Sequence, residues 1–103
     1  MQIRQDEVEF EWDEGNRNKI FERHGITVEE AESVFKDKNS VVLPDVEHSQ
    51  NEERFVIVGK DLVGKKMHMI FTMRGNKIRV ISARRMHKKE VARYEKIKKD
   101  PTL

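Results

Sequence analysis

The chain of 103 residues contains no cysteine, two prolines, five glycines, and a single tryptophan and tyrosine. Without cysteine it has neither a disulfide framework nor thiolate chemistry, and its redox compartment stays open on that count. It also lacks a hydrophobic run of membrane-spanning length, and its acidic N-terminus does not have the form of a signal peptide. We therefore expect a soluble cytoplasmic protein with no membrane association.

The sequence also lacks internal repeats, low-complexity segments and a His-x-x-x-His pair. The absence of cysteine and of paired histidines argues against a metal site, so neither a metal nor another cofactor is expected. Hydrophobic residues make up 36% of the chain and charged residues 39%. This length and composition predict one domain over residues 1–103, with a modest core and a charged tail. Small proteins with so little apolar content often gain stability from a partner.

The net charge of +2 conceals a strong division along the chain. Residues 1–53 carry 15 acidic and 6 basic side chains, a net charge of −9, whereas residues 54–103 carry 4 and 15, a net charge of +11. A basic half can recruit a polyanion because the local field decides binding. Alternatively, the two halves neutralise each other across the fold.

The spacing of apolar residues predicts five strands and three helices. We expect strands over 8–12, 40–43, 54–59, 67–72 and 77–83, and helices over 14–24, from 28 onward, and over 87–99. Asp13 is a suitable N-cap and Gly25 a suitable C-terminal residue for the first helix. Thr27 and Glu30 form the capping-box pattern of the second. Because helices and strands are segregated, the order indicates the α+β class, an antiparallel sheet with helices on one face.

The segment Phe71–Arg85 combines a turn, the most β-prone run of the chain and a cluster of arginines. Gly75 and Asn76 supply the positive φ angles that a hairpin turn needs. In the strand that follows, the residues that point to each of the two faces of the sheet include apolar ones, so we expect this strand to be central in the sheet. Burying a lone guanidinium is costly, so Arg79 needs a carboxylate partner or a wet groove.

The order and spacing of several short motifs resemble the BrnT-type toxins, over about residues 9–95. The motifs are Phe10–Asp13, His24–Ile26, Glu29–Ala31 with Val34, Phe35 and Asp37, Asp45 with His48–Ser49, Glu52–Arg54, Phe71–Gly75, Ile78–Arg85, Glu90 and Tyr94. The block from Ile78 to Arg85 is the most diagnostic part of the resemblance.

The resemblance implies a RelE-like ribonuclease fold and a toxin of a type II toxin–antitoxin system, which cleaves RNA and halts translation. The partner it implies is a BrnA-type antitoxin, a ribbon-helix-helix DNA-binding protein that neutralises the toxin and represses the shared operon. We therefore expect a hetero-oligomer with toxin and antitoxin in equal numbers, an RNA substrate, and contact with operon DNA through the antitoxin.

Metal-independent RNA cleavage uses the adjacent 2′-hydroxyl as nucleophile, so it needs a base, an acid and cations around the phosphate. Arginine grips phosphate with two donors, while histidine or a carboxylate can exchange the protons. The catalytic candidates are His24, His48, Glu53, Arg79 and Arg84, and the RNA-binding candidates are Arg54, Arg74, Arg79, Arg84 and Arg85. Which group acts as base and which as acid is left open at this point.

Each arginine candidate also has an ordinary structural role. Arg79 can form a salt bridge with Glu53 or with another acidic residue of the first half. Arg84 and Arg85 can be solvated charges or contacts of the antitoxin, and Arg74 lies in a turn where basic side chains are common.

The other candidates have structural alternatives as well. His24 ends a helix, where a protonated imidazole complements the helix dipole. His48 can be a plain loop residue, and Glu53 with Arg54 can be a surface ion pair of small energetic value.

Two positions depart from the family pattern. Many relatives have a small residue and then Thr or Ser after the paired arginines, where this chain has Met86 and His87. We expect a weaker helix cap there and an added titratable group beside the arginines. His68 stands where the strand is more often apolar.

Two functions other than RNA cleavage remain open. One is an inactive toxin-like module that binds the antitoxin and modulates operon DNA binding. The other is a plain RNA-binding domain, which the lack of aromatic residues exposed on a sheet disfavours.

Overall fold

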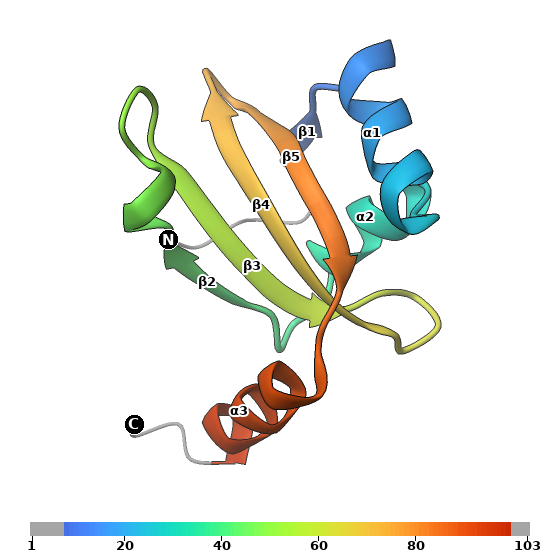
Figure 1. Ribbon diagram of the computed structural model, residues 1–103, viewed down its shortest axis with the longest axis vertical. Coiled ribbons are helices and arrows are strands. Elements are labelled where there is room, and N and C mark those ends of the chain that lie inside the picture. Colours follow the sequence, from blue (N-terminus) through green and yellow to red (C-terminus); the bar gives the residue numbers. More distant parts are fainter. Residues whose placement is uncertain (1–7, 100–103) are drawn as a thin grey trace.

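The computed structural model describes residues 8–99, apart from the side chains of His48 and residues 97–99 (Figure 1). Its elements are β1 (Glu9–Phe10), α1 (Glu14–His24), α2 (Val28–Val34), β2 (Val41–Pro44), the short 3-10 helix η1 (Val46–His48), β3 (Arg54–Lys60), β4 (Lys66–Arg74), β5 (Lys77–Arg85) and α3 (Lys88–Lys99). The order of strands and α-helices agrees with the sequence prediction. None of the helices in this part of the chain is both long and apolar enough to cross a bilayer.

Helix α1 begins and ends at the predicted residues, and helix α2 begins at the predicted residue. Asp13 accepts a hydrogen bond from the backbone N–H of Asn16, whose side chain accepts one from the N–H of Asp13. Thr27 and Glu30 exchange the same pair of bonds at the start of α2. Gly25 ends α1 at φ 67°, a left-handed conformation that glycine adopts without steric cost.

The α+β class is confirmed, but the sheet is mixed and its centre lies one strand away from the predicted one. The strand order is β1-β5-β4-β3-β2, so β4 is central and β5 borders the two-residue β1. The pairs from β2 to β5 are antiparallel, as short hairpins require. β1 pairs with β5 in parallel, which the long connection between them through α1, α2 and three strands permits.

Helices α1 and α2 cover one face of the sheet (Figure 1). The residues buried between these layers include Ile20, Ile26, Val34, Phe35, Ile57, Met67, Met69, Phe71, Ile78 and Val80. Phe35 joins the layers by edge-to-face contacts with Phe10 and Phe71, at centroid distances of 5.3 and 5.1 Å. Burial of these apolar side chains is the main stabilising term of the fold.

Asn16 fastens α1 to the edge of β5. Its side chain is buried, and Nδ2 donates to the carbonyl oxygens of Glu11 and Val80, both at 3.2 Å. Because β1 pairs only with Lys77 and Ile78, the edge of β5 that faces away from β4 has no strand of the described residues beside Val80. The amide of Asn16 therefore satisfies a carbonyl that would otherwise lack a partner.

Helix α3 does not share the face of α1 and α2, so the expectation of helices on one face is wrong for this element. It lies at one end of the sheet (Figure 1), where Glu95 pairs with Lys66 at 3.1 Å and the Tyr94 hydroxyl donates to the carbonyl of Asn39 at 3.3 Å. Lys66 alternates along β4 with the buried Met67 and thus lies on the opposite face.

Replacing Asn16 by alanine should lower the free energy of unfolding by roughly 2 kcal/mol, because it leaves buried backbone groups without partners. Asn18→Ala is the matched control, since Asn18 lies exposed on the same helix, and its effect should stay within about 0.5 kcal/mol. Urea denaturation followed by circular dichroism measures both. Equal effects of the two substitutions would contradict the anchoring role of Asn16.

Candidate functional site

One extra residue in β5 decides which of its arginines share a face. The pairs on either side of it are Ile70 with Ser82 and Phe71 with Val80. Ile81 between them has no partner in β4 and forms a β-bulge. Arg79 is therefore opposite Thr72, and Arg84 opposite His68. Both arginines lie on the face away from α1 and α2, although strict alternation would separate residues five positions apart.

Arg79 is bound by carboxylates of the N-terminal half. Its guanidinium lies 3.2 Å from Glu11 and 2.8 Å from Asp13, and its side chain is 17% exposed. Arg74 reaches the same Glu11 at 3.4 Å. The backbone N–H of Asn16 and then the side chain of Arg79 donate hydrogen bonds to the Asp13 carboxyl, and these bonds hold its pKa below the ordinary value. The expected salt bridge with an acidic residue of the first half is present, and the partners are Glu11 and Asp13.

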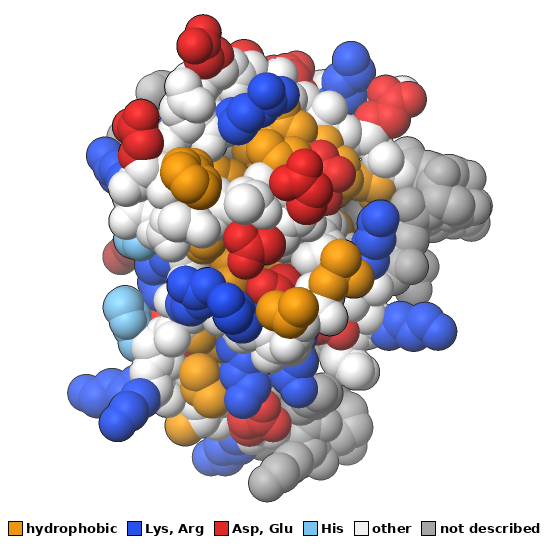
Figure 2. Space-filling view, turned by 90° about the vertical axis from the view of Figure 1, so that its right-hand side faces the viewer, with side chains coloured by type: hydrophobic (Ala, Val, Ile, Leu, Met, Phe, Trp, Pro, Cys, Tyr) orange, Lys and Arg blue, Asp and Glu red, His pale blue; other side chains and the backbone are white. Residues whose placement is uncertain are grey.

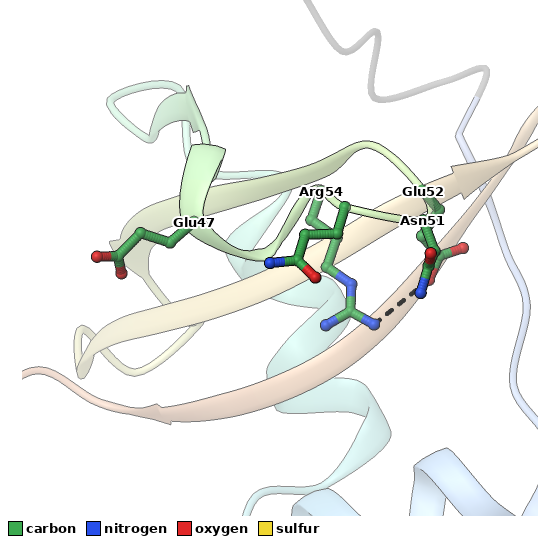
Figure 3. A pocket seen from close by; sticks show the side chains of 5 residues that line it. Glu47, Asn51, Glu52 and Arg54 are labelled. Atoms are coloured by element: carbon green, nitrogen blue, oxygen red, sulfur yellow. Dashed lines mark ion pairs between the residues drawn. The ribbon is translucent and has the colours of Figure 1, made fainter.

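A second group of candidates surrounds a polar hollow at the start of β3. The hollow has a volume of about 500 Å³ and is lined by Glu47, Gln50, Asn51, Glu52 and Arg54. Arg54 extends toward Glu52, 3.5 Å away, while Glu47 points to the other side (Figure 3). The Nε of Arg54 is buried with no hydrogen-bond partner among the described residues. Glu53 is exposed, and its backbone carbonyl accepts a hydrogen bond from Thr72.

The other end of β5 holds a basic depression of about 260 Å³. It is lined by His24, Arg84, Arg85, Met86 and His87. His24 is the last residue of α1, the two arginines end β5, and His87 is the residue before α3. Two imidazoles and two guanidinium groups thus surround one concave site, and they come from segments about sixty residues apart. We call this site the His/Arg depression.

His87 is the N-cap of α3. The last ladder bond, from Met86 N–H to the carbonyl of Lys66, holds the chain at the end of the sheet. The carbonyl of His87 accepts from Val91 N–H, and its own N–H donates to Glu90 Oε1 at 2.8 Å. Glu90 thus supplies one half of a capping box. The backbone of His87 is fixed, while its side chain is exposed.

Arg84 is held by a bidentate ion pair with Glu90. Its Nη1 and Nη2 lie 2.7 and 2.9 Å from the two carboxylate oxygens. The bond from Arg84 lowers the pKa of Glu90 to about 2, although burial opposes this shift, and Glu90 raises the pKa of Arg84. His68 lies 3.9 Å from Glu90, but burial and then Arg84 lower its pKa. His68 is therefore neutral at physiological pH.

Arg85 differs from the other arginine candidates in its freedom. It is exposed, and none of the hydrogen bonds or ion pairs resolved for the described residues involves its side chain. The guanidinium groups of Arg54, Arg74, Arg79 and Arg84 each contact a carboxylate. Basic side chains also gather at the end of the molecule where α3 lies (Figure 2). A phosphate can therefore reach Arg85 and the two imidazoles without breaking an ion pair.

The predicted site residues fall into two groups. His24, Arg84 and Arg85 line the His/Arg depression, whereas Glu53, Arg54, Arg74 and Arg79 lie toward the other end of the sheet. Thr72 and His68 mark these ends on β4, and four residues of strand separate them by about 13 Å. His48 lies in η1, and its side chain is outside the described part. His87 was not among the candidates, although its place after the paired arginines was a signal.

No group of three or more His, Cys, Asp or Glu side chains within the described residues is arranged to hold a metal ion. The basic character of the depression fits an anionic ligand instead. Phosphate binding by the arginines and proton exchange by the imidazoles are the chemistry that these side chains support.

The Glu90 carboxylate should make the free energy of unfolding depend on pH in the acidic range. It stays ionised down to about pH 2 in the folded state but has an ordinary pKa of 4.5, so its contribution is complete above pH 4.5 and is lost as the pH falls toward 2. Because 30% of the Glu90 side chain is exposed, we expect its ionised form to contribute roughly 1–2 kcal/mol to the free energy of unfolding. Urea denaturation between pH 7 and 3 should show that the free energy of unfolding varies less with pH in Glu90→Gln than in wild type. Glu22→Gln, on the exposed surface of α1, should keep the wild-type dependence, and an unchanged slope in Glu90→Gln would contradict the assignment.

Comparisons with known proteins agree on one family. A model of the ribonuclease toxin BrnT of type II toxin–antitoxin systems matches residues 12–90. The crystal structure of the Brucella abortus ribonuclease toxin BrnT matches with a TM-score of 0.56 and 22% identity, over 79% of this chain and 99% of that one. A comparison with curated proteins finds no match. The structural match shows a shared fold, and the family model spans most of the chain, so this protein belongs to the BrnT family of ribonuclease toxins of type II toxin–antitoxin systems.

Proposed function

We propose that this protein is a metal-independent endoribonuclease whose scissile phosphate binds in the His/Arg depression. The observation that carries the proposal is the meeting of His24, Arg84 and Arg85 in one concave site. Guanidinium groups stabilise the negative charge that builds up on phosphorus, and an imidazole can exchange a proton with the ribose. The attacking oxygen is the neighbouring 2′-hydroxyl, so the chemistry needs no activated water.

The two arginines of the depression have different parts in this proposal. Arg85 meets the phosphate directly, since its side chain is exposed. Arg84 is engaged with Glu90 at 2.7 and 2.9 Å, so in this conformation it positions the start of α3 and adds positive field to the depression. A phosphate would need to displace Glu90 to gain the full fork of Arg84.

The candidates at the other end of the sheet serve a different part of the RNA chain. Glu53 and Arg54 lie about 13 Å along the sheet from the level of Arg84, which is beyond hydrogen-bond reach of the same phosphate. We infer that Arg54, Arg74 and Arg79 add weak contacts to neighbouring nucleotides, because carboxylates already offset their charge. A role for His48 and Glu53 would likewise lie there.

Membership of the BrnT family supports a proposal for the biological setting. We infer that the enzyme acts in the cytoplasm, that it inhibits translation by cutting RNA, and that a BrnA-like ribbon-helix-helix antitoxin neutralises it. Toxin and antitoxin would combine in equal numbers, and the antitoxin would connect the complex to operon DNA. The mostly apolar hollow of about 450 Å³ that exposes Phe21 between α1 and α2 offers space for a partner without closing the depression.

A second candidate function is an inactive toxin-like module that binds the antitoxin and modulates its DNA binding. The pairing of Arg54, Arg74, Arg79 and Arg84 with carboxylates favours it, because each pair reduces the charge available to a substrate. This alternative predicts that induced expression leaves growth unaffected and that the purified protein leaves RNA intact, whether or not ribosomes are present.

Arg85→Ala should lower the rate of RNA cleavage about tenfold or more, because it removes a phosphate-binding cation. Arg93→Ala is the matched control, since Arg93 is exposed on α3 and should leave the rate within about twofold. Purified proteins are compared on a fluorescent oligoribonucleotide, with circular dichroism as a check of folding. Cleavage by wild type with equal rates for both variants would place the phosphate elsewhere, and no cleavage by wild type, with and without ribosomes, would refute the enzyme proposal.

A further inference from the structure

We propose that His87 is a second catalytic residue and that it forms an acid–base pair with His24 across the depression. This inference rests on the proposed ribonuclease function and deepens it, because it assigns both proton transfers. The two imidazoles come from the end of α1 and the start of α3, and they line the same concave site. Sequence separation conceals this arrangement, which depends on where β5 ends.

Both histidines have fixed backbones and exposed side chains. His24 precedes Gly25, whose N–H donates to the carbonyl of Phe21 at 2.7 Å and ends α1. His87 is fixed through its carbonyl and through the bond from its N–H to Glu90 Oε1. The hydrogen bonds and ion pairs resolved among the described residues do not involve either imidazole. Both rings are therefore accessible to an RNA backbone held in the depression.

The charged groups around the pair come from every neighbouring element. They are Arg23 beside His24 on α1, Arg84 and Arg85 of β5, and Lys88 and Glu90 of α3. Glu30 of α2 is also near, since it interacts electrostatically with Arg85. Glu90 is bound to Arg84 and to the N–H of His87, so its oxygens are occupied. Among the residues that line the depression, only the imidazoles ordinarily exchange protons near neutral pH.

The reaction balances with these two groups alone. The neutral imidazole takes the proton of the 2′-hydroxyl while the 2′-oxygen forms a bond to phosphorus. The bond from phosphorus to the 5′-oxygen breaks, and that oxygen takes a proton from the imidazolium of the other histidine. The products are a 2′,3′-cyclic phosphate and a 5′-hydroxyl, and Arg85 offsets the charge on the phosphoryl oxygens throughout.

A purely structural role for His87 is separable from catalysis. Its cap function uses the backbone N–H and carbonyl, and Asn or Thr at an N-cap supports a helix at least as well. His87→Asn and His87→Thr therefore remove the imidazole and keep the cap. Lys88→Gln is a matched control, since it removes a positive charge at the adjacent exposed residue and leaves both imidazoles.

The test is the pH dependence of oligoribonucleotide cleavage by the full chain. Wild type and Lys88→Gln should give a bell-shaped profile. His24→Gln, His87→Asn and His87→Thr should each be slower by about 10²-fold or more and should each lose one limb of the bell. Thermal unfolding of the His87 variants should match wild type, which shows that the cap is intact.

A substrate with a bridging 5′-sulfur identifies the acid, because a thiolate leaves without taking a proton. One of the two histidine variants should recover activity on this substrate and the other should not. If wild type cleaves RNA but the His87 variants keep its rate or both limbs of its bell, the inference fails while the proposed function stands. If both histidine variants recover, or if neither does, the pairing is also wrong. If wild type does not cleave RNA, both proposals fail together.

Discussion

A single constraint, the register of β5 against β4, determines where the functional side chains of this protein lie. The bulge at Ile81 places Arg79 and Arg84 on the same face of the sheet. Arg84 then meets Glu90, whose carboxylate also accepts the N–H of His87. Without the extra residue, alternation would direct Arg84 toward the helical layer, where Met67 and Ala83 are buried. The start of α3, and with it the depression, therefore depends on this bulge.

The charge division of the sequence takes two forms in the folded protein. Part of it is internal neutralisation, since Glu11 and Asp13 bind Arg74 and Arg79 where β1 leads into α1. The remainder is a basic end of the molecule around α3 (Figure 2). Neutralisation between the two halves is thus confirmed for Arg74 and Arg79, while the recruitment of RNA by the basic end stays a prediction.

Local features of the fold could be predicted from the sequence because they depend on neighbouring residues. Asp13, Thr27 and Gly25 fix the ends of α1 and α2 by side-chain and backbone chemistry within a few residues. The turn between β4 and β5 was also predicted, but only Gly75 has a positive φ there, so the expectation of a positive φ at Asn76 is wrong. The resemblance to BrnT toxins rested on motif order, and the family model confirms it.

Long-range features could not be predicted in the same way. The parallel pairing of β1 with β5 joins residues nearly seventy positions apart. The only sign of the bulge in the sequence is that both alternating sets of residues in β5 contain apolar residues, and this pattern also fits a central strand that is covered on both faces. For the same reason the sequence identified His24, Arg84 and Arg85 separately but not their meeting with His87. It also did not reveal that Arg79 binds Glu11 and Asp13, because many acidic residues of the first half were possible partners.

The most direct test of the central claim is the chemistry of the RNA ends that the purified protein produces, analysed in the presence and absence of EDTA. We predict cleavage that EDTA does not reduce, with 2′,3′-cyclic phosphate and 5′-hydroxyl ends, because the 2′-hydroxyl is the nucleophile and side chains transfer the protons. Cleavage that requires a divalent cation, or products with 5′-phosphate ends, would contradict it.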